Sequence, residues 1–145
     1  MQRYVVGLLF DEGRFNVVLI HKTHGPKCVV GRWNGVGGHI EPGETPIQAM
    51  VREFREEAGV RTREHDWTPV AELSSGVAQV YFYACENEGY FMDAHTCTDE
   101  EIAVFNVDQL PSRLVTNLTW MIPWLADPFI IRQYMEIMLK WDQEI

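Results

Sequence analysis

A short acidic segment constrains this chain more than any other part of its sequence. Five carboxylates fall within the seventeen residues from Glu41 to Glu57, and three of them, Glu53, Glu56 and Glu57, lie in a five-residue run. Positions i, i+3 and i+4 share one face of a helix, so these three side chains are expected to lie together. Like charges at that spacing destabilise a bare helix by roughly 0.2–0.5 kcal/mol per pair, a penalty that a bound cation removes.

Local signals predict that this segment forms a helix over Thr45–Ala58. Thr45 is a candidate N-cap, Pro46 occupies the first helical position, and Gln48 completes a capping box. Gly59 predicts the end of the helix, because glycine enters the left-handed conformation at small cost. Apolar residues recur at helical spacing and form a stripe on a different face: Ile47, Met50, Val51, Phe54 and Ala58.

The spacing G-x5-E-x7-R-E-φ-x-E-E-x-G-φ, where φ is apolar, runs from Gly38 to Val60 and resembles the signature of the Nudix hydrolases at every defined position. Phe54 stands where that family more often has an aliphatic residue. A solvated acidic face paired with Arg52 and Arg55 is the plain reading of an isolated E-x-x-E-E, but the preceding loop G-G-H-I-E-P-G-E favours the family. The resemblance implies an α/β/α sandwich, in which helices cover both faces of a mixed sheet.

Composition narrows the class of protein. The chain has 145 residues, 46% of them hydrophobic, which suits one globular domain over residues 1–145. A net charge of −9 disfavours nucleic acid as a partner, although metal ions can still bridge an acidic protein to a small polyphosphate. Three cysteines without C-x-x-C spacing indicate reduced thiols in a cytoplasmic protein, and no apolar run is long enough to cross a membrane. The sequence leaves open whether the protein is a monomer or a homodimer.

Most of the remaining chain reads as strands. They are expected over Tyr4–Phe10, Phe15–His21, Trp33–Gly38, Trp67–Ser74, Val77–Cys85 and Ile102–Val107, with a further short strand over Tyr90–Met92. The first two form a predicted hairpin, and Ser75-Gly76 joins the fourth and fifth tightly. A second helix is expected over Phe129–Trp141, from its periodicity and the start signal Asp127-Pro128. Without the short strand Tyr90–Met92, the order β-β-β-α-β-β-β-α predicts an α/β fold with a mixed sheet between helices.

The resemblance implies a metal site. Nudix enzymes hydrolyse nucleoside diphosphates linked to a further group, and metal ions clamp the phosphates. By position in the signature, Glu56 and Glu57 look like the principal metal ligands, Glu53 looks like another ligand or a residue that orients water, and the Gly38 carbonyl looks like a backbone ligand. Carboxylate and phosphate oxygens suit Mg²⁺ or Mn²⁺.

Three other residues take expected roles from the same resemblance. Arg52 resembles the arginine that braces the helix carboxylates, and Glu44 resembles the glutamate that ties the loop to the helix. The catalytic base or a further ligand often lies outside the signature. Of Glu100 and Glu101, which precede the strand Ile102–Val107, Glu101 aligns best, with a solvated strand lead-in as the alternative. The expected catalytic set is therefore Glu53, Glu56, Glu57, Glu101 and Arg52.

The run G-R-W-N-G-V-G-G is similar to that of the MutT-like branch, which removes oxidised purine nucleotides. By that resemblance Asn34 is a candidate base reader, as is Asn117, and Trp120 is expected to stack on the base. Turn formation by Asn34 and burial of Trp120 in the core are the alternatives. His39 is expected to contact a phosphate or a water, or to be inert. The loop Thr23–Gly31 is a further candidate for specificity.

The function expected from these features is Mg²⁺-dependent hydrolysis of a (d)NTP to the (d)NMP and pyrophosphate, with oxidised purines such as 8-oxo-dGTP among the candidate substrates. Such an enzyme would serve sanitation of the nucleotide pool. The sequence also admits a Nudix hydrolase of ADP-ribose or dinucleoside polyphosphates. A third alternative is a nucleotide-sensing module without turnover, although such modules usually lose a signature carboxylate and this chain keeps them all.

Overall fold

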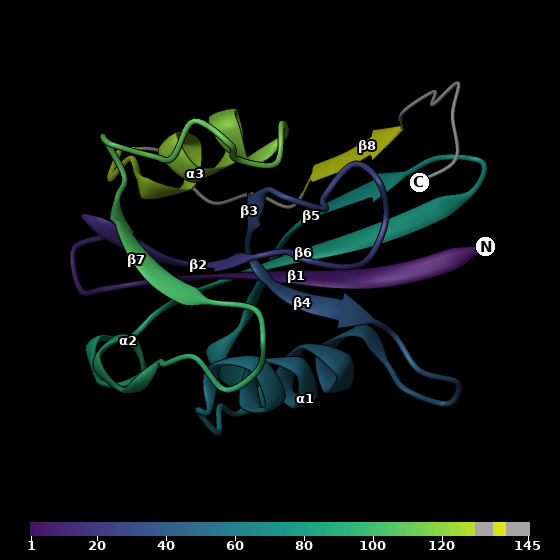
Figure 1. The fold of residues 1–145 in the computed structure, drawn as a ribbon, viewed down its shortest axis with the longest axis horizontal. Coiled ribbons are helices and arrows are strands. Elements are labelled where there is room, and N and C mark those ends of the chain that lie inside the picture. The colour runs from purple at the N-terminus through teal and green to yellow at the C-terminus, as the bar shows by residue number, and fades with distance from the viewer. Residues whose placement is uncertain (130–134, 139–145) are drawn as a thin grey trace.

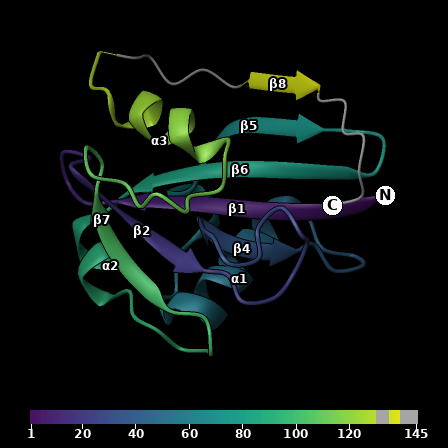
Figure 2. The same cartoon turned by 45° about the horizontal axis from the view of Figure 1, so that its top comes forward.

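The computed structural model describes residues 1–129 and 135–138, and it contains one mixed sheet with helices on both sides. Figures 1 and 2 show the helices α1 and α3 on opposite sides of the strands. The α/β/α architecture expected from the sequence is therefore confirmed. The elements are β1 (Gln2–Phe10), β2 (Asn16–His21), β3 (Trp33–Asn34), β4 (Val36–His39), α1 (Pro46–Ala58), η1 (Glu64–Asp66), β5 (Thr68–Ser74), β6 (Ala78–Glu86), α2 (Glu88–Asp93), β7 (Ile102–Asn106), α3 (Leu118–Ala126) and β8 (Met135–Met138).

Alternating apolar residues allow the sheet to be covered on both faces. Successive side chains of a strand point to opposite faces, and along β1 both sets are apolar. One set packs with α3 in a core that includes Val6, Leu8 and Phe10. The other set packs with α1 in a second core that includes Val5 and Leu9. The sheet therefore separates two hydrophobic cores.

The topology divides one edge of β1 between two partners. β4 pairs with β1 at Tyr4–Gly7, and β2 pairs with it at Leu9 and Phe10, both antiparallel. On its other edge β1 runs parallel to β6 along its whole length. The predicted strand Trp33–Gly38 is broken at Gly35 into β3, which pairs with β2, and β4. The strands β2 and β4 thus part from each other beside β1, and this division positions the site.

The predicted first helix is confirmed, as are its end signals. The Thr45 hydroxyl accepts a hydrogen bond from the Gln48 N–H, and the Gln48 side chain accepts one from the Thr45 N–H. Gly59 ends the helix in the left-handed region at φ 74°. The apolar face of α1 is buried against the sheet, with Met50 and Phe54 fully covered.

The predicted strand Tyr90–Met92 is wrong, because these residues lie in helix α2. The Asn87 side chain accepts a hydrogen bond of 2.8 Å from the Tyr90 N–H and begins the helix. A polar N-cap satisfies the free N–H groups of a first helical turn, and here it outweighs the β propensity of the aromatic residues.

The predicted helix Phe129–Trp141 is also wrong where the structure describes it. Met135–Met138 form β8, which runs parallel to β5, whereas residues 130–134 and 139–141 lie outside the described residues. The second large helix is instead α3, which the sequence analysis missed. Pro123 lies inside it, and proline normally disfavours a helix interior. In the described part of the chain, neither α3 nor any other helix is long and apolar enough to cross a membrane.

Candidate active site

A cavity of about 480 Å³ lies where the edge of β1 divides. Its acidic end is formed from α1 and the segment before it, by Gly38, Glu41, Arg52, Glu53, Glu56 and Glu57. Its apolar end is formed on the α3 side of the sheet, by Val6, Val29, Leu73, Val80, Phe82 and Val115, together with Asn34 and Asn117. One cavity therefore joins a cluster of charged groups to a hydrophobic recess that carries two amides.

Arg52 organises the acidic end. Its guanidinium donates to both carboxylate oxygens of Glu44, at 2.7 and 3.0 Å, and to Glu53 at 2.9 Å. It also donates to Glu56 at 3.2 Å and to the backbone carbonyl of His39 at 2.9 Å. One planar side chain thereby ties the loop before α1 to the helix, as bidentate guanidinium–carboxylate geometry allows.

These contacts change the pKa values of both partners. The hydrogen bonds from Arg52 hold the pKa of Glu44 below its ordinary value, and the same bonds raise the pKa of Arg52. Both groups therefore stay charged throughout the physiological range, and their ion pair links the loop to α1 over that whole range.

Glu53 is buried, which the sequence analysis did not predict. Its side chain lies against Gly38, where a Cβ atom would stand 2.7 Å from the Glu53 Oε1. Glycine at position 38 therefore allows the carboxylate to approach the backbone closely. Burial raises the pKa of Glu53, although the hydrogen bond from Arg52 opposes the rise.

Glu57 is half-buried, and its contacts differ from those of its neighbours. It accepts one long hydrogen bond of 3.3 Å from the Gly37 N–H, and among the described residues it has no ion pair within 4 Å. Burial raises the pKa of Glu57 to about 7, the nearby Lys22 opposes the rise, and the like charges of Glu53 and Glu100 add to it. Glu56, in contrast, is exposed.

The donor set at the acidic end fits a hard divalent cation. Within the described residues no three carboxylate, imidazole or thiol groups already converge as a metal site. Mg²⁺ usually takes only one or two carboxylates and completes its shell with water and substrate phosphates, so a preformed cluster is not required. The Glu57 carboxylate lines the cavity, and a cation there would favour its charged form, which burial and the like charges of Glu53 and Glu100 disfavour.

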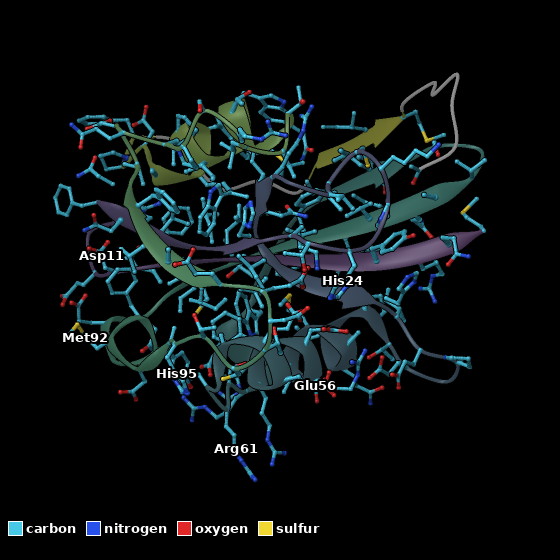
Figure 3. All side chains as sticks on the ribbon, viewed as in Figure 1. Asp11, His24, Glu56, Arg61, Met92 and His95 are labelled. Carbon is cyan, nitrogen blue, oxygen red and sulfur yellow. The ribbon has the colours of Figure 1, made fainter. Side chains whose placement is uncertain are left out.

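His39 lines the cavity beside the acidic end. Its imidazole packs against the Tyr4 ring, with centroids 4.5 Å apart and planes tilted by 40°. Both residues line the cavity. His24, from the loop after β2, and Glu56, from α1, line the same cavity and are labelled in Figure 3.

Both candidate base readers line the apolar end of the cavity. Asn34 is buried, and its Oδ1 accepts a hydrogen bond of 2.9 Å from the Gly35 N–H, which leaves its Nδ2 as a donor. The Asn117 Nδ2 lies 3.3 Å from the Met121 Sδ, which leaves its Oδ1 as an acceptor. With the amides oriented in this way, the recess offers one donor and one acceptor.

Long-range contacts bring Asn117 to this place. The Trp33 N–H donates to the Arg113 carbonyl at 2.7 Å, and the Val115 N–H donates to the Trp33 carbonyl at 2.9 Å. The segment before α3 is thereby attached to β3, and Asn117 faces the same cavity as Asn34.

Two predicted site residues are not brought into the cavity. Trp120 is 44% exposed and is not among the lining residues, because it lies on the side of α3 that faces away from the core. Glu101 is exposed and also outside the cavity, and its backbone carbonyl continues the pairing of β7 with β2 by accepting from the His21 N–H at 2.8 Å. Its neighbour Glu100 is the buried carboxylate of this pair.

The sequence analysis missed several lining residues. The loop after β2 contributes His24, Pro26 and Cys28, and Lys22 precedes that loop. The motif G-R-W-N-G-x-G-G follows this loop directly, so it marks where the loop ends. It does not indicate which side chains of the loop face the cavity. The sequence pointed to this part of the cavity only through the general prediction that the loop Thr23–Gly31 affects specificity.

Comparison with known proteins supplies the family. The model of the NUDIX domain matches residues 1–126. Solved structures of similar fold include a mutator MutT protein from Bacillus halodurans, with TM-score 0.69, 15% identity, and coverage of 100% of this chain and 95% of that one. A MutT NUDIX hydrolase from Burkholderia pseudomallei has TM-score 0.68 and 18% identity over 84% of this chain and 95% of that one. An ADP-ribose pyrophosphatase from Streptococcus suis has TM-score 0.64 and 16% identity over 93% and 98%. At these identities the structures establish a shared fold.

Proposed function

Because this chain belongs to the Nudix hydrolase family, we propose that it is a Mg²⁺- or Mn²⁺-dependent pyrophosphohydrolase that converts a nucleoside triphosphate to the monophosphate and pyrophosphate. The observation that carries this proposal is the single cavity that joins an acidic end to an apolar recess with two amides. A nucleotide has the same division, with a charged polyphosphate at one end and an apolar, hydrogen-bonding base at the other.

The acidic end would hold the metal and the phosphates. Glu56, Glu57, Glu53 and the Gly38 carbonyl are the proposed ligands, and a divalent cation bound by them would supply positive charge beside the phosphate oxygens. Arg52 does not approach the substrate in this proposal. It holds Glu44, Glu53 and Glu56 in place and offsets their mutual repulsion.

The chain also offers groups that can accept a proton from the attacking water. Water must lose a proton as it attacks phosphorus, and a carboxylate of raised pKa is a stronger base than an ordinary one. Burial raises the pKa of Glu53 and of Glu57 in the metal-free protein. A bound cation lowers the pKa of its own ligands, so the base in this proposal is whichever of the two does not bind the metal. The exposed Glu101 lies outside the cavity and is the weaker candidate for this step.

The apolar end would select the base. Asn34 presents a donor and Asn117 an acceptor, so a purine edge that offers an acceptor and a donor fits the recess. We extend the proposal to purine nucleoside triphosphates, with oxidised purines such as 8-oxo-dGTP as the class to test first. Hydrolysis of such nucleotides would serve sanitation of the nucleotide pool.

Product analysis on a nucleotide panel tests this function. Purified protein with Mg²⁺ is incubated with canonical and oxidised (d)NTPs, ADP-ribose, NADH and diadenosine polyphosphates in ¹⁸O water, and both products are analysed by mass spectrometry. The proposal expects monophosphate and pyrophosphate from a purine triphosphate. Inorganic phosphate as the primary product, or turnover of ADP-ribose alone, would contradict it.

A further inference from the structure

One wall of the cavity is a loop that leaves the sheet and returns to it. We call residues 23–30 the wall loop. Its two ends are held together, because the Lys22 N–H donates to the Arg32 carbonyl at 2.9 Å and the Gly31 N–H donates to the Lys22 carbonyl at 2.8 Å. Five of its residues line the cavity: His24, Gly25, Pro26, Cys28 and Val29.

A buried carboxylate holds the start of this loop. Glu100 is only 1% exposed, and its Oε2 accepts hydrogen bonds from the Thr23 N–H at 2.8 Å and the His24 N–H at 3.4 Å. Its Oε1 accepts from the Lys22 Nζ at 2.9 Å. Burial opposes ionisation of Glu100, but these bonds outweigh it and hold the pKa of Glu100 below its ordinary value.

Glu100 is itself fixed to the sheet. Its N–H donates to the Thr98 hydroxyl at 3.1 Å, and the carbonyl of the next residue, Glu101, accepts from the His21 N–H at 2.8 Å. The carboxylate therefore projects from a rigid point beside β2 and β7 into the start of the wall loop. It does not line the cavity, whereas Lys22 does.

We infer that Glu100 is a positioning residue for the substrate: it fixes the wall loop and holds the Lys22 ammonium at the cavity, without touching the reacting atoms. The inference rests on the proposed function and adds a determinant outside the acidic segment. It differs from a role as catalytic base or metal ligand, since Glu100 does not line the cavity. Among the described residues, the groups in contact with its carboxylate belong to Lys22 and the wall loop: the Lys22 ammonium, the Thr23 and His24 N–H groups, and the His24 imidazole at 3.7 Å.

The inference predicts an effect on binding more than on chemistry. The wall loop contacts the substrate before and during the reaction alike, so loosening it removes binding that the ground state and the transition state share. Glu100→Gln keeps the size of the side chain but removes its charge. An amide has only one accepting oxygen, so it can accept either from Lys22 Nζ or from the backbone N–H groups, but not from both sides as the carboxylate does. KM should rise about tenfold, the scale of one charged hydrogen bond, while kcat stays within about threefold.

A second variant and a control make this test specific. Lys22→Met keeps the hydrogen bonds that the Thr23 and His24 N–H groups donate to Glu100, and should also raise KM. Because the two side chains act as a unit, the double variant should cost little more than the worse single variant. Asp108→Asn removes an exposed carboxylate beyond the far end of β7 and should leave both constants unchanged.

Hydrogen exchange supplies a readout that does not need turnover. In Glu100→Gln, peptides that cover residues 22–31 should exchange faster than in the wild type, and peptides that cover α1 should not. A wild type that hydrolyses no nucleotide would defeat the proposed function but leave this measurement interpretable. A fall in kcat of about 10²-fold at unchanged KM, the scale of a lost catalytic contact, would overturn the inference, as would unchanged exchange in residues 22–31.

Discussion

The two ends of the cavity are built in opposite ways. The acidic end comes from one continuous stretch, Gly38–Glu57, and Arg52 ties its parts together with hydrogen bonds to both the loop and the helix. The apolar end is assembled from strands and from the segment before α3, which are far apart in the sequence. Local spacing specifies the first and long-range packing the second. We therefore expect the acidic end to control rate and the apolar end to control choice of substrate.

If the acidic end controls rate, removal of the metal should have the largest effect on activity. In excess chelator the rate should fall on the order of 10³-fold, because a metal ion that neutralises phosphate charge contributes several kcal/mol to transition-state stabilisation. Millimolar Mg²⁺ or Mn²⁺ should restore it. The measurement is pyrophosphate release against free metal concentration, and full turnover in excess chelator would show that the acidic end is not a metal site.

Loss of a single carboxylate at the acidic end should come next. Glu56→Gln and Glu57→Gln should each lower kcat on the order of 10²-fold or more, comparable to the loss of a major electrostatic contact. Neither variant should melt at a lower temperature without metal, since Glu56 is exposed and the charged form of Glu57 is disfavoured by burial. Asp108→Asn is the matched control. A variant that retained wild-type kcat would exclude that residue as a ligand.

Changes at the apolar end should alter discrimination. Asn34→Ala or Asn117→Ala removes one hydrogen-bonding group, which costs roughly 1–3 kcal/mol and corresponds to about a five- to 150-fold change in kcat/KM. The loss should fall only on bases that use that group. Comparison of kcat/KM for dGTP, 8-oxo-dGTP, dATP and dCTP measures it. An equal drop for all four, with a lower melting temperature, would mean that these residues support the fold and do not read the base.

The smallest expected effect links metal binding to pH. The folded-state pKa of Glu57 is raised from 4.5 to about 7, so in the metal-free protein the folded state holds the proton more tightly and stability falls as pH rises between these values. A metal binds only the deprotonated carboxylate. Added Mg²⁺ should therefore raise the melting temperature more at pH 8 than at pH 5.5, by a few degrees, and Glu57→Gln should reduce the difference. Scanning calorimetry measures it, and an equal shift at both pH values would argue against Glu57 as a ligand.

The contrast between local spacing and long-range packing also explains what the sequence could predict. Helix α1 was predicted to its ends, because Thr45, Gln48 and Gly59 act on their immediate neighbours. Burial of Glu53 was not predicted, because it depends on the close approach of Gly38 from another element. Asn117 was identified only through a resemblance, and its placement depends on contacts between Trp33 and the segment before α3.

Errors in the fold have similar causes. Residues 90–92 are helical because the Asn87 cap outweighs the β propensity of the aromatic residues in α2. Helix α3 was missed because Pro123 lies inside it, although burial of Leu118, Met121 and Ile122 stabilises the helix. Packing of an apolar face supplies most of the stability of helices in proteins, which single-residue propensities do not capture.

The parallel pairing of β1 with β6 has a consequence for how the molecule forms. Residues 2–10 are synthesised well before residues 78–86, with which they pair, so one edge of this strand has no partner until β6 has also been made. Contacts between distant segments form slowly, and an unpaired apolar strand can associate with other chains in the meantime. The strand that contributes to both cores is therefore also a segment that can aggregate while the chain is being made.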